Sequence, residues 1–142
     1  MQKNVEKMSI NYSPNFNIQK RGVSKVKYII FHYTGMKSES GALRKLTNIN
    51  SKVSCHYFIK KNGEIMHLVP NLYVAWHAGI SSWKNEKNLN SKSIGIEISN
   101  PGHNYGYKNF NKRQIKSIIK LSRFLKKKYN IKKENFLGHS DI

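Results

Sequence analysis

Apolar residues along the chain occur in short blocks whose spacing predicts alternating strands and helices. Val26 to His32 is almost continuously apolar, as is typical of a strand that is buried on both faces. Ser93 to Ser99 alternates between isoleucine and other residues, which is the period of a strand. Two further apolar runs, 55–59 and 65–69, flank Asn62-Gly63. An Asn-Gly pair in this setting predicts a hairpin whose two turn residues both have positive φ.

Two other segments have the apolar spacing of helices. Ser38 to Asn48 predicts a short helix with Ser38 as its N-cap. Asn111 to Tyr129 predicts a long amphipathic helix. We expect its core-facing residues to be Ile115, Ile118, Ile119, Phe124 and Leu125. Phe136 to His139 predicts one more strand. This order of elements predicts an α/β fold, with a mixed central β-sheet flanked by helices.

Length and composition exclude several classes of protein. The 142 residues suffice for one domain, which we expect at 25–142 after a polar N-terminal arm, residues 1–24. The mean hydropathy is -0.65 and no stretch approaches the ~18 consecutive apolar residues of a membrane span, so we expect no transmembrane segment. The single cysteine, Cys55, excludes an intrachain disulfide framework. Its place in a predicted strand favours a buried apolar residue over a nucleophile.

The net charge of +19, from 26 Lys+Arg and 7 Asp+Glu, would suit an anionic partner such as nucleic acid, a lipid surface or an acidic polymer. The lysines are nevertheless spread along a chain that is also rich in Asn and Ile, as a biased nucleotide composition would produce. The densest run, Lys126 to Lys128 with Lys132 and Lys133, brackets the end of the long predicted helix. Both a solvated helix end and a binding patch fit this run. No nucleic-acid-binding motif accompanies it.

Two histidines and one glutamate are the strongest candidates for chemistry. His32 ends the most apolar strand and His139 ends a later apolar segment, and open α/β sheets bind ligands at strand ends. Single histidines are more often structural, but two imidazoles held by rigid strands would suit zinc. Glu97 lies inside the alternating strand with Gly95 on the same face. That face is either solvated or the place of a general acid–base group.

A loop at 74–90 contains two tryptophans, Trp76 within Trp-His-Ala-Gly79 and Trp83. Aromatic side chains exposed above a cleft stack well on sugar rings or on apolar ligand faces. Either tryptophan could equally be an anchor in the core. The loop is therefore a candidate binding segment next to the predicted strand ends.

Eight short stretches follow one another along the chain. They are Ser13-Pro-Asn-Phe16, Ile30-Phe-His-Tyr-Thr-Gly-Met36, Val53-Ser-Cys-His-Tyr57, Asn62-Gly-Glu-Ile65, Ala75-Trp-His-Ala-Gly79, Ser93-Ile-Gly-Ile-Glu97, Asn100-Pro-Gly-His103 and Gly138-His-Ser-Asp-Ile142. Together they resemble the zinc-dependent N-acetylmuramoyl-L-alanine amidases of the amidase-2 type. That family is related in fold to phage T7 lysozyme and the peptidoglycan recognition proteins. The matches occur in family order and cover nearly everything after residue 12.

The resemblance implies that His32 and His139 bind zinc, that Glu97 occupies the catalytic glutamate position, and that Trp76 and His77 line the substrate groove. The implied reaction hydrolyses the amide between the lactyl group of N-acetylmuramic acid and L-alanine of the stem peptide, with Glu97 moving the proton of a zinc-bound water. The implied partners are peptidoglycan or muropeptide fragments. Because no signal peptide is visible, we expect a cytoplasmic location, with the periplasm as the alternative. The oligomeric state is left open.

One departure from the family pattern concerns the third zinc ligand. In the family an aspartate ligand and an oxyanion-stabilising lysine follow the stretch that matches Gly138 to Ile142, and this sequence ends there. Asp141, the only aspartate, matches the preceding motif, and on an extended strand it would point away from His139. We therefore expect an amidase-2 domain that lacks its C-terminal end. It is either an amidase completed by that end or a module that binds peptidoglycan without cutting it. A basic nucleic-acid binder is a third hypothesis, which only the charge supports.

Overall fold

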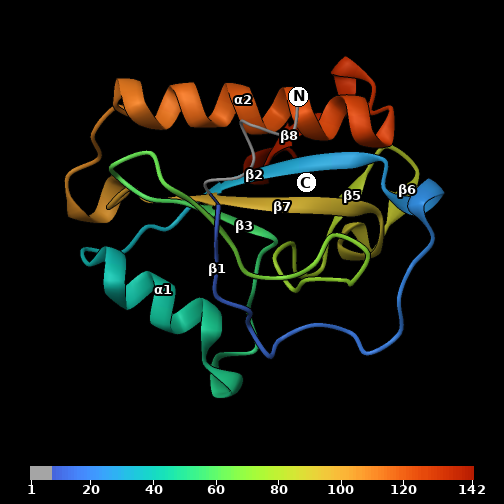
Figure 1. Ribbon diagram of the computed structural model, residues 1–142, viewed down its shortest axis with the longest axis horizontal. Helices are drawn as coiled ribbons and strands as arrows, with labels where there is room; N and C mark the ends of the chain where they lie inside the picture. The colour runs from blue at the N-terminus through green and yellow to red at the C-terminus, as the bar shows by residue number, and fades with distance from the viewer. Residues whose placement is uncertain (1–7) are drawn as a thin grey trace.

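Six strands form the central sheet in the computed structural model of the protein, which describes residues 8–142 (Figure 1). Their bounds are β1 (Ser9–Ile10), β2 (Tyr28–Tyr33), β3 (Tyr57–Ile59), β4 (Ile65–His67), β7 (Ser93–Ile98) and β8 (Phe136–Gly138). The spatial order is β1-β4-β3-β7-β2-β8, in which β3 and β4 are antiparallel and all other neighbours are parallel. The predicted mixed sheet is therefore confirmed. Two short strands, β5 (Ser82–Trp83) and β6 (Glu86–Lys87), form a separate antiparallel pair.

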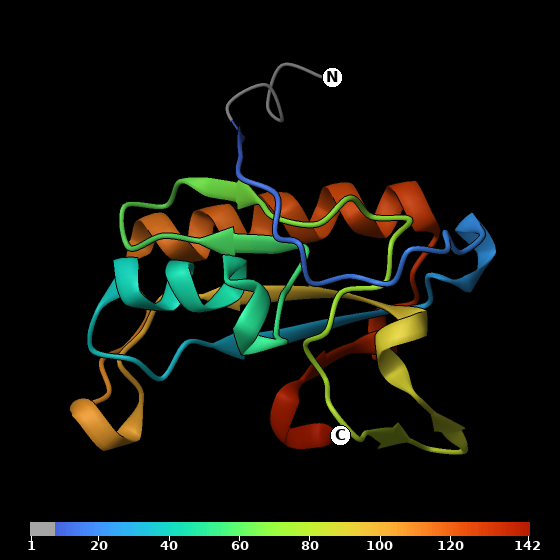
Figure 2. The ribbon, with the colours of Figure 1, turned by 90° about the horizontal axis from the view of Figure 1, so that it is seen from below.

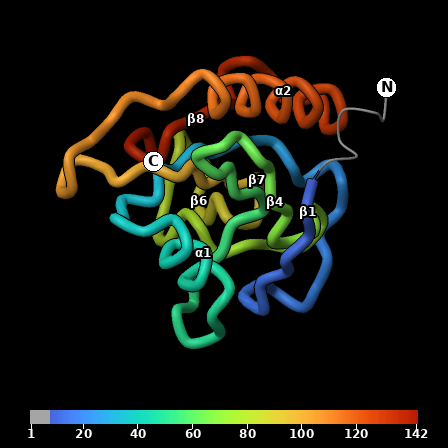
Figure 3. Tube along the Cα trace, turned by 60° about the vertical axis from the view of Figure 1, so that its left-hand side comes forward, coloured from blue at the N-terminus to red at the C-terminus, as the bar shows by residue number. Residues whose placement is uncertain are grey.

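Helices cover both faces of the sheet, with α2 (Lys112–Tyr129) on one side and α1 (Glu39–Thr47) on the other (Figures 1 and 2). The tube in Figure 3 shows the same separation, and places the C-terminus beside β8. Ile94, Ile96 and Ile98 of β7 pack in one apolar cluster with residues of α2. The alternation predicted for this strand is thus confirmed, and Gly95 and Glu97 face away from α2.

The face that α2 presents to the sheet differs from the prediction. Ile115 and Ile119 were expected in the core, but they are 45% and 46% exposed. The buried residues of the helix are Gln114, Leu121 and Leu125. A helix turns by about 100° per residue, so these three positions lie on the same side of α2. The two isoleucines lie to one side of this buried face. Gln114 occupies a buried place because its amide donates a hydrogen bond to the carbonyl of Ser99, at 2.8 Å.

Both helices begin where the sequence predicts, because side chains satisfy their first backbone N–H groups. The hydroxyl of Ser38 accepts a hydrogen bond from the N–H of Gly41, at 3.0 Å. Asn111 caps α2 by accepting from the N–H of Gln114 at 2.9 Å, while the Gln114 side chain accepts in return from the N–H of Asn111 at 3.3 Å. The predicted N-cap of the first helix is confirmed.

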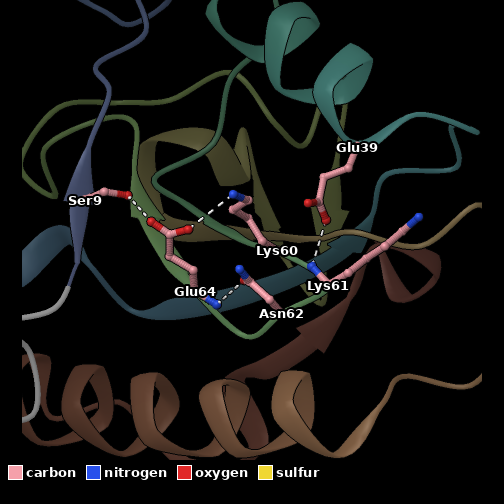
Figure 4. A network of polar contacts seen from close by, with 6 residues as sticks. All are labelled: Ser9, Glu39, Lys60, Lys61, Asn62 and Glu64. Atoms are coloured by element: carbon pink, nitrogen blue, oxygen red, sulfur yellow. Dashed lines mark hydrogen bonds and ion pairs between the residues drawn. The ribbon is translucent and has the colours of Figure 1, made fainter.

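The turn that joins β3 to β4 confirms the predicted hairpin but not its type. Only Gly63 has a positive φ, of 87°, so the turn is not the expected one with two such residues. The N–H of Gly63 donates to the carbonyl of Lys60 at 2.9 Å, and the side chain of Asn62 accepts from the N–H of Glu64 at 2.9 Å. Figure 4 shows how Glu64 also accepts from Ser9 and from Lys60, at 3.0 and 3.2 Å. These contacts fix the hairpin against the edge strand β1.

Replacing Gly63 by alanine is expected to lower the free energy of unfolding by about 2 kcal/mol or more. The new Cβ would lie 2.9 Å from the carbonyl oxygen of Arg113, in addition to the strain of a positive φ. Urea unfolding measures the change. Gly106→Ala is the matched control, because Gly106 has a φ of 76° but nothing within 4 Å of its Cβ position. Equal losses in the two variants would contradict a role for the Arg113 contact.

The N-terminal segment packs on the domain from residue 8 onward, while residues 1–7 of the predicted arm lie outside the described part of the chain. Strand β1 pairs in parallel with β4, and Asn15 is buried. The Asn15 amide donates to the carbonyls of Asn48 and Val53, at 2.8 and 2.9 Å. This segment therefore closes the edge of the sheet and holds the segment that follows α1.

Two further expectations concern Cys55 and the membrane. The Cys55 side chain is fully buried, and burial raises the pKa of its thiol well above the ordinary value, so its prediction as an apolar residue is confirmed. Within residues 8–142, no helix combines the length and the apolar character that crossing a membrane requires.

Candidate active site

A cavity of about 810 Å³ opens on the face of the sheet opposite α2. Two apolar clusters cover this face, one beneath α1, which contains Ala42 and Leu46, and one beneath the 74–90 loop, which contains Ala78. The cavity takes lining residues from both covers, Ala42 and Leu46 on one side and Trp76 and His77 on the other. It therefore lies at the gap between them, over the carboxyl ends of β2 and β7.

All five site residues that the sequence singles out line this one cavity. They are His32, Trp76, His77, Glu97 and His139. His32 and Glu97 are direct partners in the parallel pairing of β2 with β7, so their side chains leave the sheet on the same face. Strand β8 lies on the other side of β2, and His139 follows it directly. The ring centroids of His32 and His139 are 4.8 Å apart.

His32 is held as a neutral imidazole at neutral pH. The side chain is buried, and this burial, with a smaller effect of a charge on His139, lowers its pKa from 6.5 to about 3. A neutral imidazole is the form that binds a metal ion. His32 therefore has the electronic state of a metal ligand without needing to lose a proton.

The possible zinc ligands around His32 are of the right type, but there are fewer of them than a catalytic zinc site has. Two imidazoles are typical zinc ligands, whereas catalytic zinc sites have three protein ligands. Among residues 8–142 no group of three or more His, Cys, Asp or Glu side chains is arranged to hold a metal ion. Within residues 8–142, zinc would therefore be held by two imidazoles, one protein ligand fewer than in a typical catalytic site.

Asp141 does not supply the third ligand, but the reason differs from the one expected. His139–Asp141 is a turn of 3-10 helix, so the expectation of an extended strand here was wrong. The Asp141 carboxylate accepts a hydrogen bond from the N–H of Gly138, at 2.8 Å. It is therefore engaged in capping this turn, on an exposed side chain.

Glu97 is the carboxyl group that lines the cavity, and its side chain is half-buried. Burial raises its pKa from 4.5 to about 8, against a smaller opposite effect of the positive charge of Lys45. The alternative of a freely solvated strand face does not agree with this desolvation. A carboxyl with such a pKa exchanges protons near neutral pH, as acid–base catalysis requires.

His77 reaches the cavity with both ring nitrogens already in contact with protein groups. Its Nδ1 lies 3.0 Å from Nε2 of His32, and its Nε2 lies 3.0 Å from the hydroxyl of Ser93. Burial lowers its pKa well below the ordinary value, helped by the neighbouring His32. The resemblance implies that His77 lines a substrate groove. The structure adds that its hydrogen-bonding atoms are turned toward His32 and the sheet.

The two tryptophans of the 74–90 loop have different surroundings. The indole N–H of Trp76 donates to the side chain of Asn17 at 2.7 Å, and its ring lines the cavity. Trp83 packs against the apolar cluster that includes Ile30 and Leu89. Of the two roles left open by the sequence, a ring beside a ligand fits Trp76, and a core anchor fits Trp83.

Three residues of the site were not singled out from the sequence. Ser93 contacts His77, and it shares a strand face with Gly95 and Glu97, so the period of the strand could have indicated it. Asn90 accepts hydrogen bonds from two consecutive backbone N–H groups of the loop, at 3.0 and 2.8 Å, and no sequence signal marks it. Lys45 lines the cavity from α1, where it looks like any exposed lysine of an amphipathic helix.

The fold and this site define an α/β protein that carries acid–base and imidazole groups at the carboxyl ends of parallel strands. Residues 22–142 match the N-acetylmuramoyl-L-alanine amidase family, Amidase_2, and the chain belongs to this family. The resemblance seen in the sequence is thereby confirmed.

Two curated relatives illustrate the similarity. The chain is 37% identical over 130 residues to the N-acetylmuramoyl-L-alanine amidase AmiD of Escherichia coli K12, covering 83% of this chain and 46% of AmiD. It is 34% identical over 92 residues to the 1,6-anhydro-N-acetylmuramyl-L-alanine amidase AmpD of Haemophilus influenzae, covering 64% of this chain and 48% of AmpD. The chain thus spans about half the length of the curated relatives it matches.

Solved structures show the same fold. E. coli AmiD in complex with the substrate anhydro-N-acetylmuramic acid-L-Ala-D-γ-Glu-L-Lys superposes with a TM-score of 0.75 at 34% identity, over 89% of this chain and 52% of that one. The crystal structure of a selenomethionine derivative of AmpD gives a TM-score of 0.80 at 24% identity, over 96% and 83%. The predicted amidase-2 fold is confirmed.

Proposed function

We propose that this chain provides the catalytic site of an N-acetylmuramoyl-L-alanine amidase, which hydrolyses the amide between N-acetylmuramic acid and L-alanine in muropeptides. One observation supports this most strongly: a single cavity brings together His32, Glu97 and His139 from three strand ends. The relative AmiD holds an anhydromuramyl peptide as substrate in its solved structure. We take a muropeptide of this class as the substrate here.

Glu97 is proposed as the general base and acid of the reaction. Its carboxylate would accept the proton of the attacking water, and the same group would deliver that proton to the leaving amine of L-alanine. The rigid strand β7 fixes its position, since its backbone pairs with β2 and β3 on both sides. The partial exclusion of water that raises its pKa also makes proton transfer feasible near neutral pH.

His32 and His139 are the residues that would hold zinc. A zinc ion bound there would lower the pKa of a bound water to about 7 and polarise the scissile carbonyl. The two rings lie close enough, with centroids 4.8 Å apart, to turn toward one ion. Trp76 offers an aromatic ring at the cavity, suited to stacking on the sugar or on an apolar part of the peptide.

A second function is favoured by the number of zinc ligands. Because residues 8–142 contain no three-ligand group, the same cavity could hold a muropeptide without cutting it. Binding without turnover is the behaviour of a recognition module. The two functions share the cavity and differ only in whether a competent metal site forms.

The 142-residue chain, supplied with zinc, tests the proposal on an anhydromuramyl tripeptide. We expect mass spectrometry to detect release of the free peptide, and we expect His139→Ala to lower zinc affinity by at least 10-fold, because it removes a ligand. His67→Ala is the matched control, since His67 stacks on Tyr57 and does not line the cavity. Tripeptide binding without cleavage would favour the recognition module. Neither binding nor cleavage would overturn both functions.

A further inference from the structure

We infer that Ser93 and His77 are positioning residues, which fix the ring proton of His32 on Nε2 and leave its Nδ1 lone pair free. This inference deepens the proposed function, on which it rests for the identity of the ligand at Nδ1. The position of the ring proton of His32 follows from the hydrogen bonds at its Nε2 atom, on the other side of the ring from Nδ1. Those hydrogen bonds form a chain of four groups, from the carbonyl of Leu89 through Ser93 and His77 to His32.

The first group in this series of hydrogen bonds is a backbone carbonyl, which can only accept a hydrogen bond. The carbonyl oxygen of Leu89 lies 2.6 Å from the hydroxyl of Ser93, so the hydroxyl proton points at this carbonyl. A serine hydroxyl has one proton to give. Toward Nε2 of His77, at 3.0 Å, the Ser93 oxygen therefore accepts. It follows that the proton of the His77 ring is on Nε2.

The same logic passes from His77 to His32. A neutral imidazole with its proton on Nε2 has a lone pair on Nδ1. Nε2 of His32 lies 3.0 Å from this Nδ1, so His32 donates and its proton is on Nε2. The remaining nitrogen of His32, Nδ1, then has a lone pair and no proton. Second-sphere partners commonly select the tautomer of a ligand histidine in this way.

The position of the His77 ring is set from two further directions. The side chain of Asn90 accepts from the backbone N–H groups of His77 and Ala78, at 3.0 and 2.8 Å, and so anchors the loop that carries the ring. Gly95 provides the space, because a Cβ there would lie 2.4 Å from Cγ of His77. Ser93, Gly95 and Glu97 share one face of β7. On that face, the hydroxyl of Ser93 holds the His77 ring and Gly95 leaves room for it. Glu97, the proposed acid–base group, comes next along the same face.

Loss of the Ser93 hydroxyl should release this arrangement. Without it, the proton of His77 has no partner at Nε2 and can occupy Nδ1, where it would donate to Nε2 of His32. The proton of His32 would then be on Nδ1. A metal ion could bind this nitrogen only after displacing that proton. The expected consequence is a change of tautomer at His32, together with weaker metal binding.

Two-bond ¹H–¹⁵N correlation spectra of the metal-free chain, with labelled histidine, distinguish the two tautomers. We expect Nε2–H for both His32 and His77 in the wild-type protein, and a shift of His32 toward Nδ1–H in Ser93→Ala. Zinc affinity should fall by about 10- to 100-fold in that variant. Ser81→Ala is the matched control, because Ser81 is a buried serine that accepts from the N–H of Leu89, at 3.2 Å, and its hydroxyl contacts neither ring. It should leave both tautomers unchanged.

A pair of variants at His77 separates positioning from packing. Asparagine places an oxygen acceptor near the position of Nδ1, so His77→Asn should preserve the Nε2–H tautomer of His32 and most of the zinc affinity. His77→Ala removes the acceptor and should lose both. Equal zinc affinities in the two variants would contradict the inference.

The wild-type spectrum alone decides the first step, even if a variant fails to fold. A proton on Nδ1 of His32 in the wild-type protein would overturn the inference. Nε2–H on both rings in a chain that does not bind zinc would support the positioning role and refute the zinc site of the proposed function. The failures of the two proposals are therefore distinguishable.

Discussion

Replacing Glu97 by glutamine is expected to lower amidase turnover by about 10²- to 10⁴-fold, the usual contribution of a general acid–base group. Glutamine has nearly the same shape but cannot accept a proton from water or deliver one to the leaving amine. The muropeptide should still bind, since the cavity keeps its lining. Turnover of an anhydromuramyl tripeptide, measured beside its binding by calorimetry, separates the two effects. Retained turnover in Glu97→Gln would contradict the proposed role.

The same substitution is expected to stabilise the fold at neutral pH. The pKa of Glu97 is about 8 in the folded protein and 4.5 ordinarily, so between these values the folded state binds a proton that the unfolded state has released. Stability therefore falls as pH rises through this window. At pH 7 the cost to the wild-type protein is about 3 kcal/mol, which Glu97→Gln should recover. At pH 4 the difference in unfolding free energy should largely vanish.

Glu64→Gln is the control for this pH dependence. Hydrogen bonds from Lys60 and Ser9 lower the pKa of Glu64, so its ionised form stabilises the folded state above the ordinary pKa (Figure 4). Its replacement should therefore reduce stability slightly at pH 7, the opposite sign from Glu97→Gln. Urea unfolding at pH 4 and pH 7 measures both variants. If both variants changed the free energy of unfolding at pH 7 in the same direction, burial of Glu97 would not disfavour its charged form.

Replacing Gly95 by alanine is expected to lower the free energy of unfolding by about 1–3 kcal/mol and to weaken zinc binding by about 10-fold or more. The strand cannot move away from the new Cβ, because Gly95 donates to Nδ1 of His56 and accepts from the N–H of His56, each at 3.0 Å. The ring of His77 must therefore leave, and its bonds to Ser93 and His32 break. Urea unfolding and zinc titration measure the two effects.

Gly22→Ala is the control for this change, because Gly22 has an ordinary φ of -70° and its Cβ position has no neighbour closer than 4.0 Å. We expect its stability to stay within about 0.5 kcal/mol of the wild type. If Gly95→Ala kept full zinc affinity and the wild-type histidine tautomers, the position of His77 would not matter to His32.

The sequence predicted the main strands and helices and five residues that line the site, but not the short strands β1, β5 and β6. Strands 26–32 and 93–99 have unmistakable apolar patterns, so the places of His32 and Glu97 at strand ends and on strand faces followed from period alone. Parallel strands bring such ends to one edge of a sheet. His139 was predicted in the same way, from the apolar segment before it. The ordered family stretches then supplied the chemistry that geometry alone left open.

Other features depended on how elements pack. The buried line of α2 includes Gln114 and leaves Ile119 half exposed, because the acceptor for the Gln114 amide comes from the end of β7. Likewise, Asp141 turns back onto Gly138 in a 3-10 turn that the apolar pattern before it does not reveal.

The sequence by itself determined which residues reach the site, because the period of each strand and helix sets the face on which a side chain lies. Only the tertiary structure decided what those residues touch. His32 and His77 are 45 positions apart, yet their ring nitrogens meet at 3.0 Å. That contact requires the 74–90 loop to cross β7 where Gly95 leaves room. The proton positions in the site follow from this packing of distant segments, which no local pattern encodes.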